Sequence, residues 1–367
     1  MKCWVATRKG LIPWTRGSSG WSAGDAAFLG DPVTAVLKDP RDGALWAGLN
    51  LGHFGVKLRV SEDGGKQWEE VDAPSYADVG PEQAGEGSNG NEDAGPSLQL
   101  IWAIESGGPE RAGRLWAGTI PGGLFRSDDR GKNWTLMRGL WDRPERAAWF
   151  GGGYDQPGIH SVCVDPRDPD VVRVGVSCGG VWRSDDAGET WRVTTQGMFA
   201  EYMPPEQREQ PEIQDPHRMV QCPASPDVLW VQHHNGAFRS TDGGETWASL
   251  DVPPSTFGFA VAVHPHEPTT AWFVPGVKDE CRVPVDARLT VARTRDGGQS
   301  FESIAEGLPD GASYDLVYRH ALDVSEDGRT LAFGSTTGNL WISENGGDSW
   351  DLASAHLPPI YAVRFAS

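Results

Sequence analysis

The chain has few of the residues that stabilise small secreted proteins or carry a protein into a membrane. Its 5 cysteines are odd in number and lack C-x-x-C spacing, which excludes a disulfide framework and a zinc ribbon. No apolar run reaches the length of a transmembrane helix, and residues 1–10 lack the apolar core of a signal peptide. We therefore expect buried free thiols, a cytoplasmic protein and no membrane partner.

Basic residues are also scarce. The sequence holds 32 lysines and arginines against 51 acidic residues, a net charge of -19. Because nucleic acids bind to basic surfaces, this balance excludes nucleic acid as an expected partner. Acidic residues spread through turns serve solubility instead.

Helical periodicity is missing as well, whereas turn-forming and aromatic residues are plentiful. The 367 residues include 47 glycines, 27 prolines and 17 tryptophans. This composition is typical of many short strands joined by turns, with aromatic side chains packed between sheets. The sequence therefore predicts an all-β protein.

One eight-residue pattern, S-x-D-x-G-x-x-W, recurs along the chain. Its copies start 49 to 66 residues apart, a period that predicts one propeller blade or solenoid unit per copy. The six copies are Ser61 to Trp68, Ser127 to Trp134, Ser184 to Trp191, Ser240 to Trp247, Thr294 to Phe301 and Ser343 to Trp350. A continuous repeat of this kind indicates a single domain over residues 1–367.

Each repeat reads as four strands, A to D, with the pattern at the C to D turn. An Asp followed by Gly supplies the left-handed backbone that a tight hairpin needs. The third repeat shows the arrangement most clearly. Its expected strands are Ile159 to Asp165, Val171 to Ser177, Val181 to Asp185 and Trp191 to Thr195.

The repeated pattern resembles the Asp-box, or BNR repeat, of sialidase-like and sortilin-like propellers. The resemblance implies a β-propeller with the boxes at outer hairpins, remote from any active site. For sialidases it also implies an early Arg-Ile-Pro signature, but the segment Gly10-Leu11-Ile12-Pro13 lacks the arginine. We therefore expect the fold without sialidase activity.

The two ends of the chain supply strands for a further blade. Residues 2–7 and 11–15 read as strands, Trp21 opens a third, and residues 360–365 alternate like an A strand. Joining them in one sheet would remove open edges. We predict a seven-bladed β-propeller of four-stranded antiparallel blades, the last closed by the N- and C-terminal strands.

Loop length predicts where function lies. In an up-and-down blade, the A to B and C to D turns share one face, and these turns are short. The opposite face carries the long connections, at residues 72–97, 138–158, 196–216 and 275–288. Long irregular segments in compact domains are often functional.

Several histidines are expected on that same face. His160, His217 and His320 open A strands of different blades, so their imidazoles could converge on a central channel. Three imidazoles suit a divalent transition metal such as zinc or manganese. The alternatives are acid-base chemistry without a metal, and histidines that serve only in packing.

The remaining candidates fall at strand ends and in long loops of the same face. His53 and His233 lie where B strands end. The candidate catalytic residues are His53, His233, Glu280 and Tyr318, and the candidate substrate-binding residues are Arg218, His234, Lys278 and Arg319.

The histidines, basic residues and acidic residues expected on this face indicate a hydrolase- or lyase-type enzyme acting on a small polar or carbohydrate-like substrate at the mouth of the channel. A noncatalytic propeller that binds protein partners or glycans is the alternative, because one fold hosts many functions.

Overall fold

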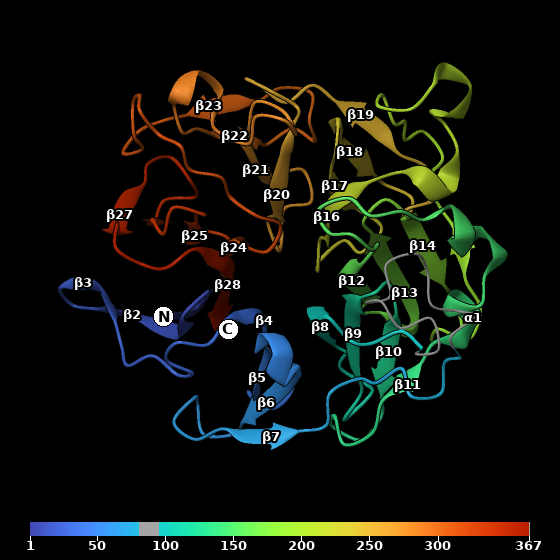
Figure 1. Ribbon diagram of the computed structural model, residues 1–367. Coiled ribbons are helices and arrows are strands. Elements are labelled where there is room, and N and C mark those ends of the chain that lie inside the picture. Colours follow the sequence, from blue (N-terminus) through green and yellow to red (C-terminus); the bar gives the residue numbers. More distant parts are fainter. Residues whose placement is uncertain (81–94, 367) are drawn as a thin grey trace. The chain divides into compact units, whose positions relative to one another are not determined.

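The computed structural model describes residues 1–80 and 95–366 (Figure 1). Its strands form seven four-stranded antiparallel sheets, the blades of a β-propeller. This confirms the predicted all-β, seven-bladed fold. Most of the predicted connection at residues 72–97 lies outside the described residues. Within the described ranges, no helix is both long and apolar enough to cross a membrane.

The chain divides into two compact units, and the first comprises Met1–Val33, Gln196–Glu209 and His217–Ser367. It holds four blades. Three follow one another in the chain between β16 and β27, and the fourth combines β28 with β1, β2 and β3. Its elements are β1 (Lys2–Thr7), β2 (Gly10–Gly17), β3 (Gly20–Ala23), η4 (Pro205–Gln207), β16 (Pro216–Gln221), β17 (Leu229–His233), β18 (Gly236–Ser240), β19 (Ala248–Leu250), β20 (Gly258–Val263), β21 (Ala271–Pro275), η6 (Val285–Ala287), β22 (Val291–Thr294), β23 (Glu302–Ile304), β24 (Leu322–Val324), β25 (Leu331–Gly334), β26 (Leu340–Ser343), β27 (Asp351–Ser354) and β28 (Ile360–Ala366).

The second unit comprises Thr34–Thr195 and Gln210–Pro216, and holds the other three blades. The chain passes from one unit to the other at four points: inside β4, after Thr195, after Glu209 and inside β16. The elements of the second unit are β4 (Val33–Lys38), β5 (Leu45–Asn50), η1 (Gly52–Phe54), β6 (Val56–Ser61), β7 (Glu69–Val71), β8 (Leu100–Ser106), β9 (Leu115–Ile120), β10 (Leu124–Ser127), β11 (Thr135–Leu136), α1 (Arg138–Trp141), η3 (Pro144–Ala148), β12 (Ile159–Asp165), β13 (Asp168–Val176), β14 (Gly180–Ser184), β15 (Arg192–Val193) and η5 (Pro211–Ile213).

The blade shared by the two chain ends has the strand order β28-β1-β2-β3. β1 and β28 are antiparallel, with Cys3 opposite Phe365 and Val5 opposite Val363. Cys3, Val5 and Val363 are buried, so the pairing contributes to the core as well as covering the edge of β1. The predicted closure of the last blade by both termini is confirmed.

The Asp-boxes connect the third and fourth strands of six blades, as predicted. In the third box, Ser184 Oγ accepts the N–H of Gly188 at 2.8 Å and donates to an oxygen of Asp186 at 2.8 Å. The same oxygen of Asp186 accepts the N–H of Thr190 at 2.8 Å. Gly188 has a φ of 90°, a conformation that favours glycine. The box is therefore a self-contained turn.

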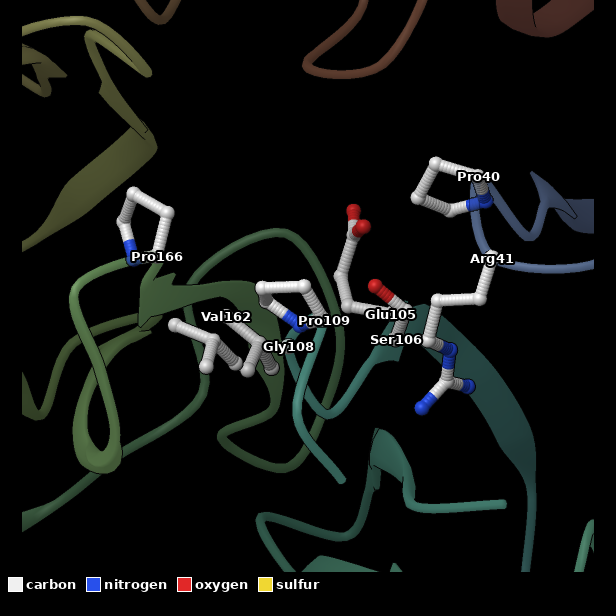
Figure 2. Close-up of a pocket in the computed structure, with 9 residues that line it drawn as sticks. Pro40, Arg41, Glu105, Ser106, Gly108, Pro109, Val162 and Pro166 are labelled. Atoms are coloured by element: carbon white, nitrogen blue, oxygen red, sulfur yellow. The ribbon is translucent and has the colours of Figure 1, made fainter. Parts of the chain in front are cut away.

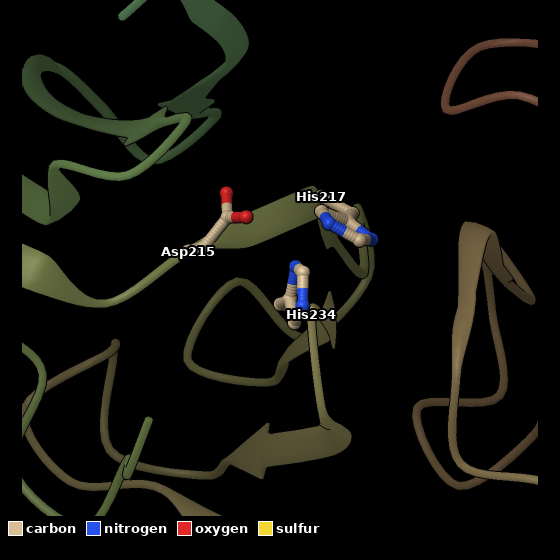
Figure 3. A group of neighbouring side chains, drawn as sticks. All are labelled: Asp215, His217 and His234. Atoms are coloured by element: carbon tan, nitrogen blue, oxygen red, sulfur yellow. The ribbon is translucent and has the colours of Figure 1, made fainter. Parts of the chain in front are cut away.

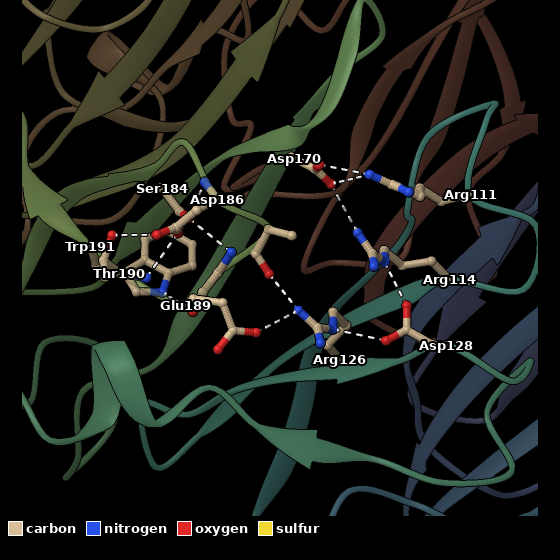
Figure 4. A network of polar contacts seen from close by, with 12 residues as sticks. Arg111, Arg114, Arg126, Asp128, Asp170, Ser184, Asp186, Glu189, Thr190 and Trp191 are labelled. Carbon is tan, nitrogen blue, oxygen red and sulfur yellow. Dashed lines mark hydrogen bonds and ion pairs between the residues drawn. The ribbon is translucent and has the colours of Figure 1, made fainter.

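Arginines tie one such hairpin to the preceding blade of the second unit (Figure 4). Arg126, from β10, donates to the carbonyl of Ala187 inside the third box at 2.6 Å. It also pairs with Asp128 at 3.0 Å and with Glu189 at 3.2 Å. Arg111 and Arg114 both contact Asp170 in the same network. These charges stabilise neighbouring turns, so their role is structural.

Each of the six box-bearing blades places a tryptophan in its core. All six side chains are at most 2% exposed. Truncating a buried tryptophan to alanine costs about 3–5 kcal/mol. The residues are Trp46, Trp116 and Trp182 in the second unit, and Trp230, Trp272 and Trp341 in the first.

Candidate functional site

His217 is the second residue of β16 and is 2% exposed. Its imidazole stacks on Phe259, with 4.3 Å between ring centroids and 12° between planes. Its Nδ1–H donates to the carbonyl of Gly258, the first residue of β20, at 2.6 Å. The histidine therefore joins the first strands of two consecutive blades.

His234 follows β17 and lies beside His217, with 5.4 Å between the two ring centroids. The ring of Tyr202 meets His234 edge to face at 4.8 Å, and Phe257 does so at 6.1 Å. Figure 3 shows the two histidines with Asp215, which precedes His217 by two residues in the chain. Tyr202 is 38% exposed and His234 is half-buried, so this edge of the group can be reached by a ligand.

Phe259 lies at the centre of a larger group in the first unit. Tyr318 meets its ring at 5.7 Å, and the guanidinium carbons of Arg282 and Arg319 lie 5.3 and 5.1 Å from its centroid. Cations over aromatic rings are attracted by the ring quadrupole. We call this set the aromatic–arginine cluster. It consists of Tyr202, His217, His234, Phe257, Phe259, Arg282, Tyr318 and Arg319.

Asp315 anchors the segment that carries Tyr318 and Arg319. Its carboxylate accepts hydrogen bonds from Ser313 and Ser335, each at 2.6 Å. Two further hydrogen bonds come from the side chains of Thr337 and Asn339. Burial acts to raise the pKa of Asp315, but these hydrogen bonds outweigh it and the net pKa is lowered. An ionised Asp315 thus fixes the start of the segment.

Lys278 and Glu280 lie on an exposed turn of the 275–288 excursion. Their side chains pair at 3.6 Å and are 63% and 75% exposed. Arg282, on the same turn, pairs with Asp279 at 2.5 Å. Because Arg282 also lies over the ring of Phe259, its partner Asp279 is linked to the aromatic–arginine cluster, and Glu280 is the next residue of the same turn.

Three further candidates of the first unit are buried. His233 is fully buried, packs edge to face on Phe238 at 5.3 Å, and its Nδ1 accepts the N–H of Asn235. His320 precedes β24 and is 6% exposed, and its carbonyl accepts the N–H of Val363 at 2.9 Å. Arg218, next to His217, is also buried, at 8% exposure.

The second unit holds His53 and His160. His53 was expected at the end of a B strand, as His233 is. It lies instead in η1, after β5 has ended, and its side chain is exposed, whereas that of His233 is buried. His160 is fully buried, and its Nε2–H donates to the carbonyl of Pro216 at 2.6 Å. That carbonyl belongs to the first residue of β16, so His160 repeats the contact that His217 makes with β20.

Within the first unit, the structure brings together His217, His234, Tyr318 and Arg319 of the predicted residues. The predicted metal ligands His160 and His217 each use one ring nitrogen for a main-chain carbonyl. The metal site at His160, His217 and His320 stays a prediction.

Sequence reasoning missed Phe257 and Phe259. Phe259 is the second residue of β20, the position that His217 occupies in β16 and His160 in β12. Aligning the first strands of consecutive blades could have identified it.

The second unit also contains a cavity of about 450 Å³ (Figure 2). It lies beside the turns that join the first and second strands of three blades, the face where only tight turns are expected. The carboxylate of Glu105 points into the space bordered by these turns. The lining residues are Pro40, Arg41, Glu105, Ser106, Gly108, Pro109, Val162, Val164 and Pro166.

Comparisons with known proteins agree with the repeat. The family model of the BNR-Asp box repeat matches residues 124–136, and that of the BNR/Asp-box repeat matches residues 238–249. An oligoxyloglucan-reducing end-specific xyloglucanase of Emericella nidulans is 25% identical over 97% of this chain. A xyloglucanase of Acetivibrio thermocellus is 24% identical over 61% of it. The chain spans 44% and 27% of these two relatives, less than half of each.

Solved structures show the same fold at lower identity. A GH74 xyloglucanase from Xanthomonas campestris has a TM-score of 0.62 and 20% identity, over 99% of this chain and 52% of that one. YCF48 bound to D1 peptide has a TM-score of 0.52 and 12% identity, over 88% of this chain and 82% of that one. The two matched repeats and the seven blades thus show a β-propeller that contains Asp-boxes, and these solved structures share its fold.

Proposed function

We propose that the chain acts in glycan hydrolysis and binds its glycan at the aromatic–arginine cluster. The observation that carries this proposal is the similarity to an oligoxyloglucan-specific xyloglucanase, which extends over 97% of the chain. Because the chain spans 44% of that relative, the match alone supports a glycan ligand more strongly than a complete hydrolytic site.

The chemistry of the cluster supports a sugar ligand. Binding sites for small ligands combine aromatic surface with a few polar groups that fix orientation. Tyr202, which is 38% exposed, and the half-buried His234 and Tyr318 supply rings that a sugar can pack against. Arg282 and the main chain of the 275–288 turn supply donors for hydroxyl groups.

Hydrolysis of a glycosidic bond uses two carboxyl groups, one as acid and one as base or nucleophile. Asp279 and Glu280 lie on the turn that borders the cluster, linked to it by the contact of Arg282 with both Asp279 and Phe259. We assign Glu280 as the candidate acid-base group, because its side chain is 75% exposed and its contact with Lys278, at 3.6 Å, is longer than that of Asp279 with Arg282, at 2.5 Å. Glu280→Gln should then remove turnover and leave glycan binding within about twofold.

Noncatalytic binding is the second candidate. A propeller of similar length, YCF48, has been solved with a bound peptide, which shows that this fold also serves protein recognition. The two functions predict different results for the same experiment. A glycan hydrolase releases new reducing ends, whereas a binding propeller leaves the glycan intact.

The test uses xyloglucan oligosaccharides, with calorimetry for binding and chromatography for products. We expect binding that weakens about fivefold in Tyr202→Ala, because stacking contributes about 1 kcal/mol per ring. Tyr314→Ala is the matched control, since Tyr314 is 65% exposed in the same unit and lies outside the cluster. Absence of binding at millimolar oligosaccharide would refute the proposal. Binding without products would leave only the glycan-binding function.

A further inference from the structure

Arg146, a half-buried arginine of the second unit, stacks on tryptophan rings. It lies in η3, and its guanidinium carbon is 3.5 Å from the ring centroid of Trp141 and 5.9 Å from that of Trp149. Both indoles are buried, at 3% and 7% exposure. The ring faces attract the cation, but they do not replace the acceptors that its N–H groups have in water.

Three N–H donors at this place have no hydrogen-bond partner among the described residues. They are Nε of Arg146 and the indole nitrogens of Trp141 and Trp149, and all three are buried. Because a buried donor without an acceptor is costly, such groups in folded proteins generally mark the place of a water or an ion. Trp46 and Trp116 of the same unit also have indole N–H groups without an acceptor, so the guanidinium is what distinguishes this place.

The nearby carboxylates of the 138–158 connection pair with other arginines. Asp142 pairs with Arg138 at 3.1 Å, and Glu145 accepts a hydrogen bond from Nε of Arg143 at 3.0 Å. Burial lowers the pKa of Arg146, and the charges around it do not offset this effect. The guanidinium is therefore desolvated without full compensation, and a bound anion would supply what is missing.

Arg59 provides a comparison within the same unit. Its Nε is also buried without a hydrogen bond, but its guanidinium pairs with Glu70 at 2.7 Å. For the guanidinium of Arg146, the described part of the chain supplies the two ring contacts and the longer-range attraction of Tyr76 and Asp142.

We propose that Arg146, Trp141 and Trp149 form a binding site for an oxyanion of the phosphate type. The guanidinium supplies the charge and a fork of N–H donors, and the two indoles supply further donors. A phosphate group offers several strong acceptor oxygens in different directions, whereas a carboxylate has two oxygens in one plane. The site belongs to the second unit, and the inference does not rest on the proposed function.

The net charge of the chain makes the test selective. At -19, the protein as a whole repels anions, so uptake of phosphate requires a specific site. Calorimetry with inorganic phosphate on the whole chain measures the affinity, with sodium chloride holding the ionic strength constant. We expect a dissociation constant of about 1 mM or lower, because several charge-assisted hydrogen bonds form. Acetate should bind about fivefold more weakly or less tightly still.

Arg146→Met should weaken phosphate binding about tenfold or more, because it removes the charge and the fork while keeping an apolar side chain against the rings. Arg59→Met is the matched control and should keep the affinity of the wild type, since Arg59 already has Glu70 as its partner. Thermal melting checks the fold of both variants. If Arg146→Met does not fold, Arg146→Lys decides, because it keeps the charge but loses the fork and should bind phosphate about threefold or more weakly.

The other outcomes would overturn the proposal. Failure of the wild type to bind phosphate would show that water serves these donors. Equal phosphate affinity in the wild type and in the folded Arg146 variant would remove this arginine from the site. Acetate binding as tight as that of phosphate would overturn the assignment to an oxyanion of the phosphate type.

Discussion

The imidazole of His217 lies parallel to the ring of Phe259, with 4.3 Å between their centroids. The first strands of two consecutive blades thus meet through a stacked pair, and a hydrogen bond from His217 to Gly258 reinforces it. His160 makes the equivalent hydrogen bond to Pro216. The buried His217 therefore joins two consecutive blades of the first unit, in addition to any role in binding.

The contact between His217 and Phe259 predicts a large loss of stability in His217→Ala. The substitution leaves a cavity against Phe259 and removes the donor to the buried carbonyl of Gly258. We expect the free energy of unfolding to fall by about 2–4 kcal/mol. Urea denaturation measures it, with His356→Ala at an exposed position as control. Unchanged unfolding of His217→Ala would contradict the joining role.

The metal prediction has a separate thermal test. If His160, His217 and His320 hold a zinc or manganese ion, saturating metal should stabilise the folded chain by about 2–4 kcal/mol, because the ion binds the folded state alone. Melting temperature should rise by several degrees in the wild type and stay constant in His320→Ala. Equal melting curves of the wild type with metal and with chelator would rule the site out.

The Asp-boxes predict a loss of stability in acid. A side-chain hydrogen bond from Asn133 lowers the pKa of Asp129 to about 2, and one from Ser300 lowers that of Asp296 to about 2. An unfolded Asp has a pKa of about 3.9. The stabilisation by these carboxylates is therefore complete above about pH 4 and disappears as the pH falls toward 2.

Asp296→Asn tests the acid effect at one box. The variant should be less stable than the wild type at pH 7, and the difference should shrink as the pH approaches 2. Melting temperatures between pH 7 and pH 2 measure this change, with Asp351→Asn at an exposed position as control. A difference that is constant over this range would show that ionisation of Asp296 has no part in the turn.

Asp315 is predicted to act as a positioning residue for the aromatic–arginine cluster. Asp315→Ala leaves the buried hydroxyls of Ser313 and Ser335 without their acceptor, and we expect a loss of about 2–3 kcal/mol. Glycan affinity should fall as well, because Tyr318 follows on the same segment. Asp315→Asn keeps a hydrogen-bond acceptor, so it should restore part of the stability and part of the glycan affinity. Normal affinity in a folded Asp315→Ala would contradict the positioning role.

Local patterns predicted the fold well. The strands expected at residues 159–165 and 181–185 correspond to β12 and β14, and β12 has the predicted bounds. Boundaries differed more in the fourth strand, where residues 191–195 were expected and β15 covers Arg192–Val193. Trp191 instead packs in the core at 4% exposure, whereas Trp68 and Trp134, at the same position of other boxes, are only partly buried.

The site was predicted less completely. His217, His234, Tyr318 and Arg319 were found from strand ends and loops, and the structure places them in one cluster of the first unit. His233 was expected with them, but packs on Phe238. Successive strand residues point to opposite faces, so a shift of one position decides which partner a side chain meets.

The sequence by itself determined the seven blades and their box turns, because each box is built from hydrogen bonds between residues four positions apart or fewer. The closure of the last blade also followed from the alternating pattern at both ends. Only the tertiary structure decided that Tyr202, Arg282 and Arg319 share one surface with Phe259. These contacts join loops that are distant in sequence, and packing between blades, rather than any local period, sets their course.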